Sequence, residues 1–142
     1  MILPDVNVLV YAFRAESRDH ERYRGWLQGL ANGEEAYAVA SMVLGSFIRV
    51  VTNSRIFRPP SSLELALQFA ERLLMPSHCI PINPGARHWG IFTRLCREIG
   101  ATGNLVPDAF LAALALEHGC ELVTNDADFA RFRGLRWRHP LA

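Results

Sequence analysis

The stretch GNLVPDAFLAALALEHGCELVTND, residues 103–126, contains in order a helix, a strand and an acid, and this order points to the fold class. Pro107 suits the first position of a helix, because the N–H that proline lacks would be unsatisfied there. Gly119 is typical of the end of a helix, and the apolar run at 120–124 predicts a buried strand. Asp126 follows that strand after one intervening residue, Asn125. The apolar stripe of the helix consists of Phe110, Leu111 and Leu114.

The same alternation runs along the whole chain. It predicts a parallel sheet with helices on both faces, and ligands bind outside the carboxyl ends of the strands in such sheets. Pro4 cannot donate a ladder hydrogen bond, so either the first strand ends by Leu3 or its last amide faces away from the neighbouring strand. Strands are expected at 2–3, 36–40, 79–82, 120–124 and 135–137, with helical patterns within 7–12, 18–31, 41–51, 61–74, 85–99 and 107–118.

Three polar residues are expected to begin helices. Asn7 is placed to cap the first helix and Ser41 to cap the helix that follows the second strand. Ser61 and Glu64 have the S-x-x-E spacing of a capping box.

Length and composition limit the class of protein. The 142 residues suit one domain over 1–142, half of them are hydrophobic, and the formal net charge is +1. All fifteen basic residues are Arg, which excludes phosphate-binding loops, Schiff bases and receiver domains that depend on a lysine. The widely spaced Cys79, Cys96 and Cys120 are expected to be small buried hydrophobes. No signal peptide or membrane-length apolar run is present, so a cytoplasmic protein without membrane contact is expected.

Three separate segments bring an acid to one edge of the predicted sheet. Asp5 follows the first strand, Asp126 follows the fourth, and Asp108 lies in the first turn of the helix between them. Each acid alone also suits a helix cap or a turn. Together, carboxylates in apolar surroundings with no lysine near them repel one another, and a divalent cation relieves the repulsion. Ligands that are all oxygen favour Mg²⁺ or Mn²⁺, which assist hydrolysis of phosphodiesters.

In these three acids and in the residues around them, the sequence resembles a PIN-domain ribonuclease of the VapC type, the toxin of a toxin–antitoxin pair. The resemblance is carried by DVNVLVYAF at 5–13, SMVLGSFIRVVTNSRIF at 41–57 and GNLVPDAFLAALALEHGCELVTNDADFARF at 103–132, with the ending GLRWRHPL. It implies a three-layer α/β/α fold with a short central parallel sheet. It also implies an Mg²⁺-dependent endoribonuclease (Mn²⁺ being a possible substitute), neutralised by a cognate VapB antitoxin. A homodimer and a transfer RNA substrate are further implications.

The resemblance also assigns roles to single residues. Asp5, Asp108 and Asp126 match the catalytic, metal-binding acids of the family. Asp128 is either a further ligand or the cap of a short helix beginning at Phe129. Two polar residues, Asn7 and Thr124, match positions that hold the carboxylates by hydrogen bonds.

One position departs from the family pattern. Many members carry a glutamate four residues before Arg49, where this chain has Gly45, and no acid lies between Glu35 and Glu64. The metal site then rests on three or four aspartates, and the number of metal ions is open. The alternative function is a degenerate PIN domain that binds RNA or a partner without cutting.

The remaining expectations concern surfaces. Arginines near the predicted active edge, including Arg55 and Arg58, are candidates for phosphate contacts. None of the five histidines has metal-site spacing. The aromatic residues expected to line a groove for the antitoxin are Tyr11, Phe13, Trp26 and Phe47.

Overall fold

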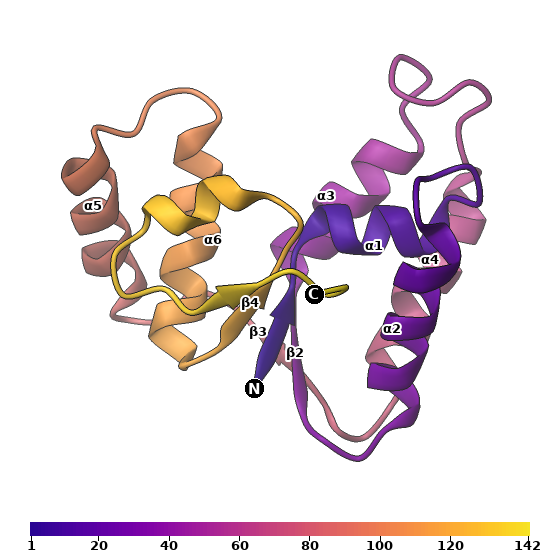
Figure 1. The fold of residues 1–142 in the computed structure, drawn as a ribbon, viewed down its shortest axis with the longest axis horizontal. Coiled ribbons are helices and arrows are strands. Elements are labelled where there is room, and N and C mark those ends of the chain that lie inside the picture. Colours follow the sequence, from indigo (N-terminus) through magenta and orange to yellow (C-terminus); the bar gives the residue numbers. More distant parts are fainter.

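A five-stranded parallel sheet lies between two layers of helices in the computed structural model, which describes all 142 residues (Figure 1). The strands are β1 (Ile2–Pro4), β2 (Tyr37–Ala40), β3 (Cys79–Ile82), β4 (Glu121–Val123) and β5 (Trp137–Arg138). The helices are α1 (Val6–Phe13), α2 (His20–Asn32), α3 (Ser41–Val51), α4 (Leu63–Leu74), α5 (His88–Ile99) and α6 (Leu105–His118), with a 3₁₀ helix η1 at Ala127–Arg131. The predicted α/β fold, three layers around a short parallel sheet, is confirmed.

The strand order β3-β2-β1-β4-β5 explains where a site can form. The chain moves from β1 outward to β3 and then returns to the opposite side of β1 as β4. Helices α1–α4 therefore cover one face and α5 and α6 cover the other (Figure 1). The connections leave β1 on its two sides in opposite directions, and ligands of such sheets bind at this point, outside the carboxyl ends of the strands, here β1 and β4.

Pro4 lies inside β1 rather than after it, aligned with Val123 of β4. The amide of Asp5 donates to Val123 O at 2.9 Å, so the nitrogen of Pro4 faces the other neighbour, β2. There it has no hydrogen to donate, and the register between β1 and β2 is limited to Ile2 and Tyr37. The strand thus continues along β4 after it has separated from β2.

The expected helix starts are shifted. Asp5, not Asn7, caps α1, and Ser41 is the first residue of α3 rather than its cap. Ser62, not Ser61, caps α4 by accepting from Leu65 N at 3.2 Å. Three further boundaries moved: α5 begins at His88, α6 begins at Leu105 with Pro107 third in the helix, and β5 is Trp137–Arg138. Caps depend on loop geometry, which residue types alone do not determine.

The core surrounds α6, which is apolar on nearly every side. Residues 111–115 are all buried, as a helix between the sheet and a second helix requires. Cys79 and Cys120 are buried and Cys96 is half-buried, all three unpaired, as expected. No helix is both long and apolar enough to cross a membrane.

Candidate active site

Asp5 joins β1 to α1 at the carboxyl edge of the sheet. Its side chain is only 6% exposed. One carboxylate oxygen accepts from Val6 N at 2.7 Å, which caps α1, and the other accepts from the hydroxyl of Thr124 at 2.7 Å. Burial raises the pKa of Asp5, and these two hydrogen bonds oppose that shift. Asn7 lies at the second position of α1, where its side chain is exposed.

Thr124 connects Asp5 to the next acid. Its fully buried hydroxyl donates to Asp5 and accepts from the amide of Asp126 at 3.1 Å. A single side chain therefore fixes both the rotamer of Asp5 and the path of the backbone that carries Asp126.

Asp126 and Asp128 have different environments. The carboxylate of Asp126 accepts from the amide of Asp128 at 2.9 Å and caps η1, which begins at Ala127. The suggestion that Asp128 caps a helix beginning at Phe129 is therefore wrong. Asp128 lies in the first turn of η1 with an exposed side chain. This position leaves its carboxylate available to a ligand.

Asp108 is brought to the same place by α6, on which it lies in the first turn. Desolvation, followed by the negative charges of Asp126, Asp5 and Asp128, raises the pKa of Asp108 to about 6. Asp108 thus lies near enough to the other three carboxylates for their charges to act on it. None of the four takes part in an ion pair with an arginine or a histidine.

The donor set suits a hard divalent cation. No three His, Cys, Asp or Glu side chains lie close enough together to hold a metal ion by themselves. Mg²⁺ keeps several water ligands and needs only one or two direct carboxylates, so a looser cluster is compatible with it. Four aspartates without a neutralising side chain, of which Asp5 and Asp108 have a raised pKa, are the donors and the uncompensated charge that such an ion requires.

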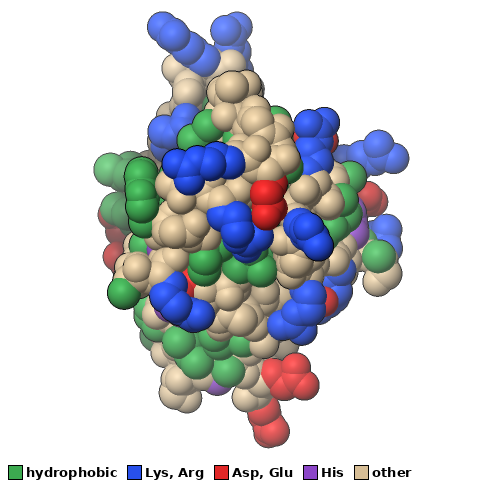
Figure 2. Space-filling view, turned by 90° about the vertical axis from the view of Figure 1, so that its left-hand side faces the viewer, with side chains coloured by type: hydrophobic (Ala, Val, Ile, Leu, Met, Phe, Trp, Pro, Cys, Tyr) green, Lys and Arg blue, Asp and Glu red, His purple; other side chains and the backbone are tan.

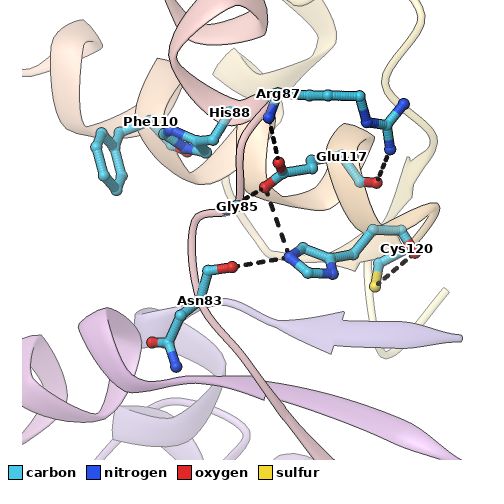
Figure 3. A network of polar contacts seen from close by, with 8 residues as sticks. Asn83, Gly85, Arg87, His88, Phe110, Glu117 and Cys120 are labelled. Carbon is cyan, nitrogen blue, oxygen red and sulfur yellow. Dashed lines mark hydrogen bonds and ion pairs between the residues drawn. The ribbon is translucent and has the colours of Figure 1, made fainter.

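A second buried carboxylate, Glu117, was not singled out from the sequence. It lies near the end of α6 and accepts from Gly85 N at 2.8 Å and from Arg87 N at 2.9 Å (Figure 3). The Arg87 guanidinium donates to the main-chain oxygen of Glu117 at 2.7 Å, and His118 Nε2 lies 2.9 Å from Asn83 O. Hydrogen bonds to backbone amides lower the pKa of Glu117. The network fixes the β3–α5 connection against the helix that carries Asp108.

Gly85 provides a test of this network. A Cβ atom there would lie 2.9 Å from Glu117 Oε2, and two amides hold that carboxylate in place. Gly85→Ala should therefore lower the free energy of unfolding by about 1–2 kcal/mol, measured by denaturant titration. Gly90→Ala, where a Cβ meets nothing within 4 Å, is the control and should not destabilise the protein. Equal stability of the two variants would contradict a tight contact at Gly85.

The apolar groove on the surface differs from the expected one. A cavity of about 330 Å³ lies between α1, α2 and α4. Of the four aromatic residues expected to line a groove, only Phe13 borders this cavity; Phe47 is completely buried. The sequence could not distinguish aromatic residues of the core from those that line a groove, because both occur at helical spacing. The cavity is lined by Ala12, Phe13, His20, Arg24, Leu27, Gln28, Ala31, Phe69, Arg72 and Leu73.

Comparison with known proteins places this fold and site in a class. The family model that matches residues 2–135 is described as the PIN domain. VapC ribonuclease Mb2897 of Mycobacterium bovis and Ribonuclease VapC43 of Mycobacterium tuberculosis are each 49% identical over 141 residues, which cover 99% of this chain and 96% of theirs. Ribonuclease VapC31 of M. tuberculosis is 41% identical over 140 residues, covering 99% of both chains. The chain therefore belongs to the PIN-domain family and, within it, to the VapC ribonucleases, as the motifs predicted.

Solved structures share the fold. A VapBC2 complex from Rickettsia felis bound to a promoter DNA fragment contains a chain with a TM-score of 0.71 and 24% identity, covering 98% of both chains. VapC20 of M. tuberculosis, described as a Sarcin-Ricin loop cleaving toxin, has a TM-score of 0.66 and 18% identity over 96% of this chain and 99% of that one. At these identities the likeness establishes the fold.

Proposed function

We propose that the protein is a divalent-cation-dependent endoribonuclease, the toxin of a VapBC pair, and that Asp5, Asp108 and Asp126 bind Mg²⁺, with Mn²⁺ as a substitute. Asp128 is a fourth, exposed carboxylate at the rim. The observation that carries this proposal is the convergence of four uncompensated aspartates at the carboxyl edge, expressed in the raised pKa of Asp108.

The site residues are buried to different degrees, and their proposed roles differ accordingly. Asp5 and Asp108 would hold the cation, while Thr124 keeps the Asp5 carboxylate oriented through its 2.7 Å hydrogen bond. A divalent cation held there would supply activation of water for attack on the phosphodiester and neutralisation of charge on the leaving oxygen. Asp126 contributes its charge from the start of η1. Asn7, exposed two residues after Asp5, is placed to contact the substrate.

Calorimetry and cleavage, measured on the same samples, test the proposal. Mg²⁺ and Mn²⁺ binding should be detectable for the wild type and strongly reduced for Asp5→Asn and Asp126→Asn. RNA cleavage should fall in parallel and stop in the presence of a chelator. Glu71→Gln, an exposed acid of α4, should change neither. A wild type that binds no divalent ion and cuts no RNA would instead support the degenerate domain that Gly45 suggests.

Transfer RNA is the first substrate to test, with single-stranded RNA and the sarcin-ricin loop as comparisons. VapC20, which shares the fold, is described as cleaving that loop. Contacts outside the four acids determine which RNA is cleaved. The acids act on the phosphodiester and do not recognise bases.

The cavity between α1, α2 and α4 suits the VapB antitoxin. Its apolar floor includes Phe13, Leu27 and Phe69, and two arginines, Arg24 and Arg72, lie at its margin. An apolar peptide segment with acidic residues matches this combination.

Arg72 provides the test of this groove, since it has no acidic partner within the chain. Arg72→Glu should weaken VapB binding by about 10- to 100-fold, because a charge reversal places like charges against each other. Titration calorimetry with purified antitoxin measures the change. Arg97→Glu, an unpaired arginine of α5 outside the cavity, should bind normally. Full affinity for Arg72→Glu would remove this groove from the interface.

A homodimer is also proposed. Exposed apolar side chains occur at several places on the surface, and three of them, Leu74, Met75 and Ile80, lie from the end of α4 to the edge strand β3 and are 39%, 78% and 42% exposed. Such a patch on a protein surface is typical of an interface. Analytical ultracentrifugation of the wild type and of Met75→Asp tests it: the variant should sediment as a monomer.

A further inference from the structure

Three arginines without acidic partners follow one another on the stretch of chain that leads away from the sheet after β2. Residues 36–63 contain Arg49, Arg55 and Arg58 but no acid. All three side chains are exposed, and none forms an ion pair with a carboxylate. Their positive charge is therefore available to an external anion. By contrast, Arg14, Arg24, Arg94 and Arg138 each pair with a glutamate.

Arg49 lies on the only exposed stripe of α3. The stripe consists of Ser41, Gly45 and Arg49, which the helix places on one face at successive intervals of four residues, and every other residue of α3 is buried or half-buried. Ser41 follows β2 directly, as Asp5 follows β1, and these two strands are parallel neighbours in the sheet with Ile2 paired to Tyr37. The stripe therefore begins beside the carboxylate cluster and runs about 12 Å away from it.

Gly45, in the middle of this stripe, has no structural reason to be glycine. Its backbone is helical, and a Cβ atom there would meet nothing within 4 Å. Alanine would favour the helix by about 1 kcal/mol. Neither packing nor backbone conformation requires glycine at this position, and the absence of a side chain leaves this face of α3 open to a ligand outside the chain.

The stripe leads to a loop that carries the other two arginines. The connection from α3 to α4, residues 52–62, extends beyond the rest of the fold (Figure 1). The space-filling view shows basic side chains at the tip of this projection (Figure 2). Arg55 and Arg58 lie in this connection, so positive charge continues from the stripe to the tip.

We propose that the RNA backbone runs from the carboxylate cluster along the Ser41–Gly45–Arg49 stripe towards Arg55 and Arg58, and that Gly45 lets the backbone lie close against α3. This inference rests on the proposed ribonuclease function and adds the substrate path to it. Guanidinium groups bind phosphate in a planar, two-pronged geometry, which favours arginine along such a path. The aspartates repel phosphates, so the arginines supply the attraction that holds the RNA beside them.

RNA binding without cleavage tests the path. The probe is a fluorescein-labelled single-stranded RNA of mixed sequence, titrated with Asp108→Asn protein in Mg²⁺ at two salt concentrations. In that background Arg49→Gln should weaken binding about five- to tenfold and reduce the slope of log K against log salt by about 0.7, as loss of one phosphate contact predicts. Arg97→Gln, on α5, is the matched control and should bind as the background does.

The role of Gly45 is tested separately from that of the arginine charge. Gly45→Leu should weaken binding at least about fivefold without lowering the melting temperature, and Gly45→Ala should raise the melting temperature. Gly29→Leu, an exposed and equally open helical glycine of α2, should not affect binding. Wild-type affinity in both Arg49→Gln and Gly45→Leu would overturn the path while leaving the ribonuclease proposal intact, provided that the wild type cleaves RNA. If the wild type neither binds nor cleaves RNA, both proposals fail.

Discussion

Asp108→Asn is expected to reduce RNA cleavage at saturating Mg²⁺ by at least about 100-fold and to abolish measurable divalent-cation binding. Asparagine keeps the shape of the side chain but removes one of the converging charges. Loss of a partner that only orients a ligand costs about 10- to 100-fold, and a direct ligand should cost more. Single-turnover cleavage and calorimetry on the same preparation measure both effects. Glu71→Gln, outside the cluster, is the control; retained cleavage in Asp108→Asn would exclude Asp108 from the site.

The same substitution should make the metal-free protein more stable at neutral pH. The pKa of Asp108 is about 6 in the folded protein, above the ordinary value of 3.8, so between these values the folded state binds more protons than the unfolded state. Stability contributed by this group therefore falls as pH rises through that window. At pH 7 in a chelator Asp108→Asn should gain about 1 kcal/mol, since solvent screens part of the repulsion at a half-buried group.

Unfolding of both proteins at pH 5 and pH 7 measures this difference. The advantage of Asp108→Asn over the wild type should be larger at pH 7, and adding Mg²⁺ should stabilise only the wild type. A wild type that is the more stable protein at pH 7 without metal would contradict the uncompensated repulsion at the cluster.

Thr124→Val is the second substitution with a large expected effect. Valine matches the shape of threonine but cannot donate to Asp5 or accept from Asp126 N. Cleavage should fall by about 10- to 100-fold, as for partners that orient metal ligands. The free energy of unfolding should fall by about 1–3 kcal/mol, since a buried carboxylate loses a donor.

A pH profile separates orientation from simple destabilisation. The Thr124 hydroxyl lowers the pKa of Asp5, so its loss should move the acidic limb of the cleavage profile of Thr124→Val to higher pH. Thr124→Ser keeps the hydroxyl and should retain both the limb and most of the activity. An unshifted limb in Thr124→Val would show that the hydroxyl does not control the ionisation of Asp5.

The sequence by itself determined the sheet and the positions of its acids. Apolar runs and helical spacing are local signals, so the alternation of strand and helix could be predicted before any contact was known. Asp5 and Asp126 follow strands in the sequence, and parallel strands end at the same edge, which placed both acids in one region. The motifs around Asp108 added the family resemblance.

Only the tertiary structure decided which groups meet. Asp126 rather than Asp128 caps η1, and Ser62 rather than Ser61 caps α4, because the path of the backbone selects the cap among neighbouring polar residues. Glu117 is an ordinary helix residue in the sequence and becomes a buried acceptor only when the β3–α5 connection passes over it. Long-range packing also buries Phe47 and leaves Gly45 open to solvent, since nothing in a helical spacing shows which face another element will cover.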